Sequence, residues 1–119
     1  MGLFRLEDFV AAGGQRLAWK VECDALDHED WRTLAHLIAS RCPSFSEVIG
    51  VPTGGIRLAM ALMPYVEPDG VGPRLVVDDV LTTGGSMLEA MTRPDDIGWV
   101  AFARGDLPPR ISAVWKLFA

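Results

Sequence analysis

Hydrophobic positions along this chain alternate between two patterns, short apolar runs and apolar residues at helical spacing. The apolar runs, typical of buried strands, cover residues 17–23, 48–51, 75–79, 97–103 and 111–118. Helical patterns cover residues 27–42, 56–63 and 86–92. Strands that alternate with helices predict an α/β fold, a doubly wound and mostly parallel sheet with helices on both faces. In such sheets ligands bind beyond the carboxyl ends of the strands, near a switch in strand order.

The helix predicted over residues 27–42 has clear signals at both ends. Asp27 is a favourable N-cap residue, with Asp30 three positions later as a weak capping-box partner, and Pro43 stops the helix. The residues expected to face the core are Trp31, Leu34, Ala35, Ile38 and Cys42. The later helix over residues 56–63 is nearly all apolar, so Met60 and Met63 are expected to pack inside.

Length and charge limit the classes of protein to consider. The chain has 119 residues, enough for one domain over residues 1–119 and too few for two. A formal net charge of −5 without a basic run argues against a nucleic-acid partner. We expect a cytoplasmic protein with no membrane partner, since no long apolar run or signal sequence is present. Cys23 and Cys42 are expected to be buried thiols.

The stretch from Leu75 to Met87 carries the most informative chemistry in the chain. An apolar run is followed by Asp78 and Asp79, and then by a loop of Thr, Gly and Ser residues that leads into a helix. Backbone N–H groups at a helix start can hold a phosphate, hydroxyls add donors, and glycine allows close approach. The two carboxylates can accept hydrogen bonds from sugar hydroxyls or help to hold Mg²⁺. The pattern favours a phosphorylated sugar as ligand over the alternative, a plain turn with an N-cap.

A second small loop, Pro52–Gly55, follows the apolar run at residues 48–51 and precedes the next helix. Alone, it could equally be an ordinary strand-to-helix turn. Because the carboxyl ends of parallel strands lie at one edge of a sheet, we expect it to share a crevice with the acidic loop.

The run from Asp78 to Ser86 resembles the phosphoribosyl-pyrophosphate (PRPP) loop of the type I phosphoribosyltransferases. The run from Gly50 to Ile56 is similar to the pyrophosphate loop of the same family. The resemblance implies that Asp78 and Asp79 hold the ribose hydroxyls and, together with PRPP, a Mg²⁺ ion. By the same resemblance, the 5′-phosphate site consists of Thr82, Thr83, Gly84, Gly85 and Ser86. The implied pyrophosphate site consists of Pro52, Thr53, Gly54 and Gly55.

Within that family the chain looks like the orotate enzymes. Purine-using relatives commonly have an acid at the position of Thr82, and residues 9–20 are similar to the N-terminal turn and strand of the orotate enzymes. That likeness makes residues 1–25 a partial base-covering segment and residues 45–105 the PRPP-binding core. It also suggests Lys20 and Arg104 as contacts to the base. The alternatives are a solvated lysine on a strand and a surface arginine in a turn.

The chain departs from the family at the lid. Orotate enzymes have a longer basic segment that closes over the site, whereas the connection over residues 64–74 has Arg74 as its only cation. Gly54 also stands where many orotate enzymes have lysine. The resemblance implies a homodimeric enzyme that converts PRPP, with Mg²⁺, and a nucleobase, a pyrimidine such as orotate, to a nucleotide and pyrophosphate. It leaves the catalytic residues unassigned.

Two other interpretations remain. The missing lid favours a non-catalytic regulatory module that binds PRPP or a nucleotide. A flavodoxin-like signalling domain would leave both the paired acids and the Thr-Thr-Gly-Gly loop unexplained.

Overall fold

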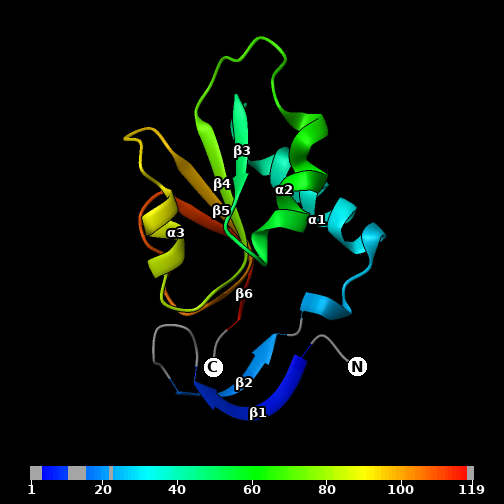
Figure 1. Ribbon diagram of the computed structural model, residues 1–119, viewed down its shortest axis with the longest axis vertical. Coiled ribbons are helices and arrows are strands. Elements are labelled where there is room, and N and C mark those ends of the chain that lie inside the picture. Colours follow the sequence, from blue (N-terminus) through cyan, green and yellow to red (C-terminus); the bar gives the residue numbers. More distant parts are fainter. Residues whose placement is uncertain (1–3, 11–15, 22, 118–119) are drawn as a thin grey trace.

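The computed structural model describes residues 4–10, 16–21 and 23–117 (Figure 1). A four-stranded parallel sheet has the order β3-β4-β5-β6, and β1 and β2 pair as a separate antiparallel hairpin. The strands are β1 (Phe4–Val10), β2 (Arg16–Val21), β3 (Glu47–Gly50), β4 (Arg74–Leu81), β5 (Ile97–Arg104) and β6 (Ile111–Leu117). The helices are α1 (His28–Arg41), α2 (Gly55–Leu62) and α3 (Gly85–Ala90), with 3₁₀ turns η1 (Cys23–Ala25) and η2 (Met63–Tyr65).

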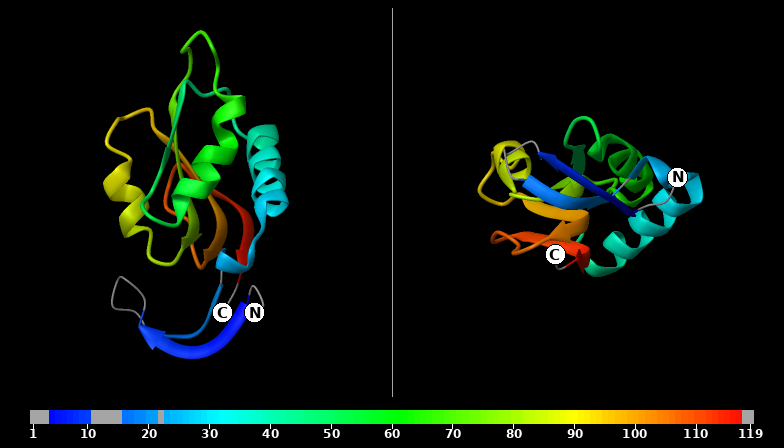
Figure 2. Two further views of the ribbon diagram at one scale, coloured as in Figure 1. Left: turned by 45° about the vertical axis from the view of Figure 1, so that its right-hand side comes forward. Right: turned by 90° about the horizontal axis from the view of Figure 1, so that it is seen from below.

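Helices cover both faces of the parallel sheet, which confirms the predicted fold class (Figure 2). On one face, α1 and α2 pack against alternate strand residues such as Leu75 and Val77. On the other face, α3 packs through Met87 against Val76 and Val100. The alternation of side chains along β4 therefore divides the core into two layers.

The strand order does not reverse, so the expected switch in strand order is absent from the described sheet. Instead, the connections change face. The β3–α2–β4 and β4–α3–β5 crossovers step in the same direction across the sheet but lie on opposite faces, so they have opposite hands. Because parallel crossovers are right-handed in about 98% of cases, one of these two crossovers has the rare hand. Since α2 and α3 lie on opposite faces of the sheet, their first turns are separated from each other beyond the carboxyl ends of β3 and β4.

Helix α1 begins as the sequence predicts. The Asp30 backbone N–H donates to Asp27 Oδ1 at 2.8 Å, and the Asp27 backbone N–H donates to Asp30 Oδ2 at 3.0 Å. This reciprocal capping box satisfies two backbone donors that a helix start leaves open. Trp31 and Ile38 are buried in the core as expected.

Three expectations about local structure need correction. Strand β4 does not end at the paired acids but continues to Leu81, so Asp78 and Asp79 lie within the second half of the strand. The side chains of Met60 and Met63 are 67% and 58% exposed, so they do not pack inside. Of the two cysteines, Cys23 is buried but Cys42 only partly, and neither forms a disulfide in the described part of the chain.

The two ends of the parallel sheet differ in what lies beyond them. At the amino ends, the connection between η2 and β4 is tied down because the Glu67 N–H donates to the Phe45 carbonyl and the Ser46 N–H donates to the Pro73 carbonyl, both at 2.9 Å. The β1–β2 hairpin lies beyond the opposite, carboxyl ends (Figure 1). No helix in the described residues is long and apolar enough to span a membrane.

Candidate functional site

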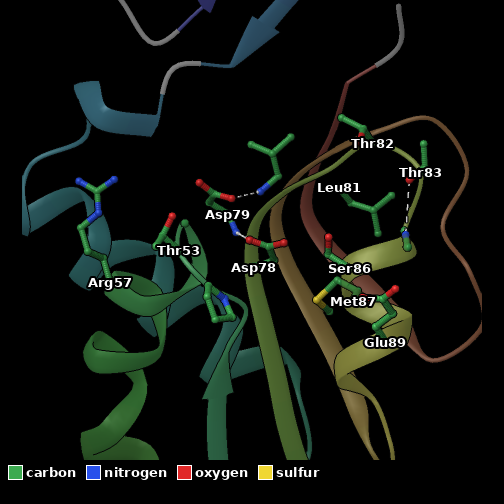
Figure 3. Close-up of a pocket in the computed structure, with 15 residues that line it drawn as sticks. Thr53, Arg57, Asp78, Asp79, Leu81, Thr82, Thr83, Ser86, Met87 and Glu89 are labelled. Atoms are coloured by element: carbon green, nitrogen blue, oxygen red, sulfur yellow. Dashed lines mark hydrogen bonds between the residues drawn. The ribbon is translucent and has the colours of Figure 1, made fainter. Parts of the chain in front are cut away.

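A pocket of about 770 Å³ opens at the carboxyl ends of β3 and β4, between the starts of α2 and α3 (Figure 3). The structure thus brings the loop after β3 and the loop after β4 to one crevice, as the sequence predicts. Its lining comprises Pro52, Thr53, Gly54, Arg57, Asp78, Asp79, Val80, Leu81, Thr82, Thr83, Gly84, Gly85, Ser86, Met87 and Glu89.

The paired acids lie in the middle of the pocket, where β4 passes between the two loops. The Asp79 backbone N–H donates to Asp78 Oδ1 at 2.8 Å, and the Val80 N–H donates to Asp79 Oδ1 at 2.8 Å. Each carboxylate is therefore held by the backbone directly after it. The remaining carboxylate oxygens are acceptors suited to a ligand that carries hydroxyl groups.

Asp78 is poorly solvated, with 9% of its surface exposed. Burial, followed by the hydrogen bond and charge of Asp79, raises the pKa of Asp78 to about 8. Two carboxylates side by side favour holding one proton between them. The pocket therefore holds a proton near neutral pH that a metal ion or another cation would displace.

The loop from Thr82 to Ser86 lines the pocket and leads the chain into α3 (Figure 3). Gly84 is the N-cap of α3 and has a φ of +87°, a conformation that favours glycine. Thr83 Oγ1 accepts from the Gly85 N–H at 3.4 Å. The N-cap residue Gly84 makes no side-chain cap, so in the described chain Thr83 takes up the Gly85 N–H and the following N–H groups of this turn can face an anion.

The loop from Pro52 to Gly54 forms the opposite wall. The Pro52–Thr53 peptide bond is cis. Helix α2 also starts at the pocket without a side-chain cap from any described residue, in contrast to α1. A methyl group built on Gly54 would overlap the Asp79 carboxylate, so the loop approaches the acid too closely for a side chain. A lysine at this position, as in many orotate enzymes, would require Asp79 to move.

Two of the residues predicted from the sequence do not line the pocket in the described structure, and the side chain of a third is not described. Gly55 is buried as the first residue of α2 and does not line the pocket in the described structure. Arg104 ends β5 and is 9% exposed, outside the pocket lining, and burial lowers the pKa of its guanidinium. The backbone of Lys20 lies opposite Arg5 in the register of the β1–β2 hairpin, but its side chain lies outside the described part. The base contacts of Arg104 and Lys20 stay predictions.

Two charged residues of the pocket were missed by the sequence reasoning. Arg57 lies in the first turn of α2, and its guanidinium carbon is 5.0 Å from the centre of the Trp31 ring. Glu89 lies on α3, one helical turn after Ser86. Each follows its loop by three residues, a spacing that puts a helical side chain on the same side as the loop.

The donor set suits a divalent cation only as part of a larger complex. Among the described residues no group of three or more His, Cys, Asp or Glu side chains can hold a metal ion. Asp78 and Asp79 supply two adjacent carboxylates, which fit Mg²⁺ if the ligand provides further oxygens. A magnesium ion chelated by a diphosphate meets that condition.

Comparison with known proteins places this geometry in context. No protein-family model matches the chain, and no curated protein sequence matches it significantly. Among solved structures, orotate phosphoribosyltransferase from Aeropyrum pernix is 27% identical with a TM-score of 0.67, over 87% of this chain and 76% of that chain.

Two further structures support the same fold at lower sequence identity. Mycobacterium tuberculosis H37Rv orotate phosphoribosyltransferase, solved with Fe(III) dicitrate, is 17% identical with a TM-score of 0.70, over 96% of this chain and 89% of that one. Leishmania donovani UMP synthase is 18% identical with a TM-score of 0.74, over 97% of this chain but 34% of the longer protein. The chain therefore has the fold of the type I phosphoribosyltransferases, in the form found in orotate phosphoribosyltransferases.

Proposed function

We propose that this chain is a phosphoribosyltransferase that uses PRPP with Mg²⁺ and a nucleobase, a pyrimidine such as orotate, to form a nucleoside 5′-monophosphate and pyrophosphate. One observation carries the proposal. A single pocket has two carboxylates at its centre and, on either side, a loop that leads into a helix with no side-chain cap in the described structure. This arrangement matches the three parts of PRPP, a sugar with a phosphate at one end and a diphosphate at the other.

The 5′-phosphate is assigned to the loop from Thr82 to Ser86. Backbone N–H groups of the turn and the hydroxyls of Thr82, Thr83 and Ser86 supply donors, and a bound phosphate would compete with Thr83 Oγ1 for the Gly85 N–H. The ribose hydroxyls then donate to Asp78 and Asp79. The diphosphate lies toward Thr53 and Gly54, at the start of α2.

The reaction breaks the bond between C1 of the ribose and the pyrophosphate oxygen, and forms a bond from C1 to a ring nitrogen of the base. The bonding electron pair leaves with pyrophosphate, the nitrogen lone pair makes the new bond, and the proton of that ring nitrogen passes to the leaving pyrophosphate or to water. Positive charge develops on the ribose in the transition state, and the Asp78–Asp79 pair lies beside it. Mg²⁺ bound to the diphosphate would neutralise charge on the leaving group.

The proton held by Asp78 has a role in binding. A protonated carboxyl offers a weaker acceptor to a ribose hydroxyl than a carboxylate does. Mg²⁺ or the developing positive charge of the ribose favours the ionised form. Binding of the magnesium complex of PRPP is therefore coupled to loss of a proton from the acid pair.

Release of pyrophosphate tests this proposal. The protein is incubated with PRPP, Mg²⁺ and a panel of pyrimidine and purine bases, and pyrophosphate is measured against a reaction without base. We expect base-dependent release that is lost when Asp78 and Asp79 are both replaced by Asn. Base-independent release or none at all contradicts the transferase proposal.

A second candidate, a non-catalytic module that binds PRPP or a nucleotide, is favoured by one structural observation. The connection over residues 66–73 lies at the amino ends of the strands, so it cannot close over the pocket. This candidate predicts that PRPP raises the melting temperature while no base yields pyrophosphate. The same pair of measurements therefore separates the two functions.

A further inference from the structure

We propose that Arg57, positioned by the indole ring of Trp31, binds the pyrophosphate group of PRPP and stabilises its charge as it leaves. The inference rests on the proposed function and assigns a cation to a site that the connection over residues 66–73 does not reach.

Charge in the pocket is the first argument. Among the described residues that line it, the acids are Asp78, Asp79 and Glu89, and Arg57 is the one cation. A ligand with a phosphate and a diphosphate brings several negative charges into this acidic environment. Mg²⁺ offsets part of that charge, and a guanidinium at the pyrophosphate loop offsets more.

The position of Arg57 is the second argument. It lies three residues after Gly54 in the first turn of α2, so its side chain rises beside the loop assigned to pyrophosphate. In Figure 3, Arg57 is at the side of the pocket next to Thr53 and across from Thr83 and Ser86. The guanidinium is therefore far from the proposed 5′-phosphate site and beside the proposed pyrophosphate site.

Trp31 restricts where the guanidinium can go. Its ring is 4% exposed in the core between α1 and α2, and the Arg57 guanidinium carbon lies 5.0 Å from its centre. A long arginine side chain normally loses considerable rotamer freedom when it binds a ligand. Contact with a fixed aromatic face reduces that loss, and the planar guanidinium carries its N–H donors in a fixed fork that suits a phosphate.

The neighbouring structure explains why the cation is here. A side chain at Gly54 would require the Asp79 carboxylate to move, and the connection over residues 66–73 is held at the other end of the sheet. The pyrophosphate loop contains no lysine or arginine, and that connection lies away from the leaving group. The first turn of α2 is the next position along the chain that reaches the same side of the pocket.

Two ligands that differ only in the pyrophosphate group test the inference. Titration calorimetry compares PRPP with ribose 5-phosphate, each with Mg²⁺, on the wild-type chain and on Arg57→Ala. We expect PRPP to bind about 10- to 100-fold more weakly to Arg57→Ala, with ribose 5-phosphate changed by less than about 2-fold. Arg57→Lys should recover part of the PRPP affinity because it restores the charge but not the planar fork.

The matched control is Arg32→Ala, which removes an exposed arginine of α1 that pairs with Glu29 and does not line the pocket. It should leave both affinities unchanged. Trp31→Phe, which keeps an aromatic ring, tests the positioning role. We expect it to weaken PRPP binding more than ribose 5-phosphate binding, after thermal melting has shown that it is folded.

The outcomes distinguish the two levels of the proposal. An equal loss of both ligands in Arg57→Ala, or no loss of PRPP, overturns the role of Arg57 while the PRPP site stands. Failure of the wild-type chain to bind either ligand overturns the proposed function itself.

Discussion

The buried proton of the acid pair makes stability depend on pH in a way that replacement of Asp78 by Asn should reveal. In the folded chain the pKa of Asp78 is about 8, because the group is buried and lies beside Asp79, against an ordinary value of 3.8. A raised pKa in an acid means that the folded state holds a proton that the unfolded state has released. Below pH 4 the raised pKa therefore costs no stability. Above pH 4 the free energy of unfolding falls as the pH rises, until the pH passes about 8.

The size of the effect follows from the two pKa values. Between them, each pH unit lowers the free energy of unfolding by up to about 1.4 kcal/mol. From pH 5 to pH 8 the loss is about 4 kcal/mol at most, since relaxation and solvent near the partly exposed Asp79 reduce it. Asn at position 78 has nearly the same shape, keeps an oxygen for the Asp79 N–H and has no proton to lose.

Urea denaturation at pH 5, 6, 7 and 8 measures this difference. We expect Asp78→Asn to gain stability relative to wild type steadily across this range. Asp106→Asn removes the same charge from an exposed connection and should show no such trend. A difference between Asp78→Asn and wild type that stays constant from pH 5 to pH 8 would refute the shared-proton interpretation.

Three further predictions concern the pocket and a control remote from it. Gly54→Ala should displace the Asp79 carboxylate and weaken PRPP binding at least about tenfold, as measured by calorimetry, because a methyl group needs the same space; unchanged affinity would show that the acid is free to move. Asp27→Ala should cost about 1 kcal/mol of stability by removing the capping box, with PRPP affinity unchanged; an altered affinity would contradict the separation of α1 start and pocket. PRPP binding with Mg²⁺ near pH 7 should release up to about one proton, seen as a binding enthalpy that varies with the ionisation enthalpy of the buffer, and Asp78→Asn should abolish that part of the release; equal release from wild type and variant would argue against Asp78 as the source.

Local signals in the sequence predicted those features that depend on local chemistry. Asp27, Asp30 and Pro43 delimit α1 because caps and proline act within one turn of the backbone. The paired acids and the loop to Ser86 were recognisable because an anion site needs small and hydroxylated residues together. That both loops share a pocket followed from the geometry of parallel strands.

Features that depend on tertiary packing could not be predicted in the same way. A nearly all-apolar helix such as α2 does not reveal which side faces solvent, so the exposure of Met60, and of Met63 in the turn η2 directly after it, was missed. Arg104 is the last residue of β5, and its burial depends on how the end of that strand packs in the fold, which the apolar run before it does not reveal. The contact of Arg57 with Trp31 joins two helices, and no spacing along the chain encodes it.

A crystal structure of the chain with PRPP and Mg²⁺ is the most direct test of the central claim, that one pocket binds all three parts of PRPP. We expect the 5′-phosphate within hydrogen-bonding distance of the turn from Thr82 to Ser86, and the ribose hydroxyls on Asp78 and Asp79. The pyrophosphate should lie between Thr53 and Gly54 on one side and Arg57 on the other. A ligand bound outside this pocket, or one whose ribose does not contact the acid pair, would contradict the claim.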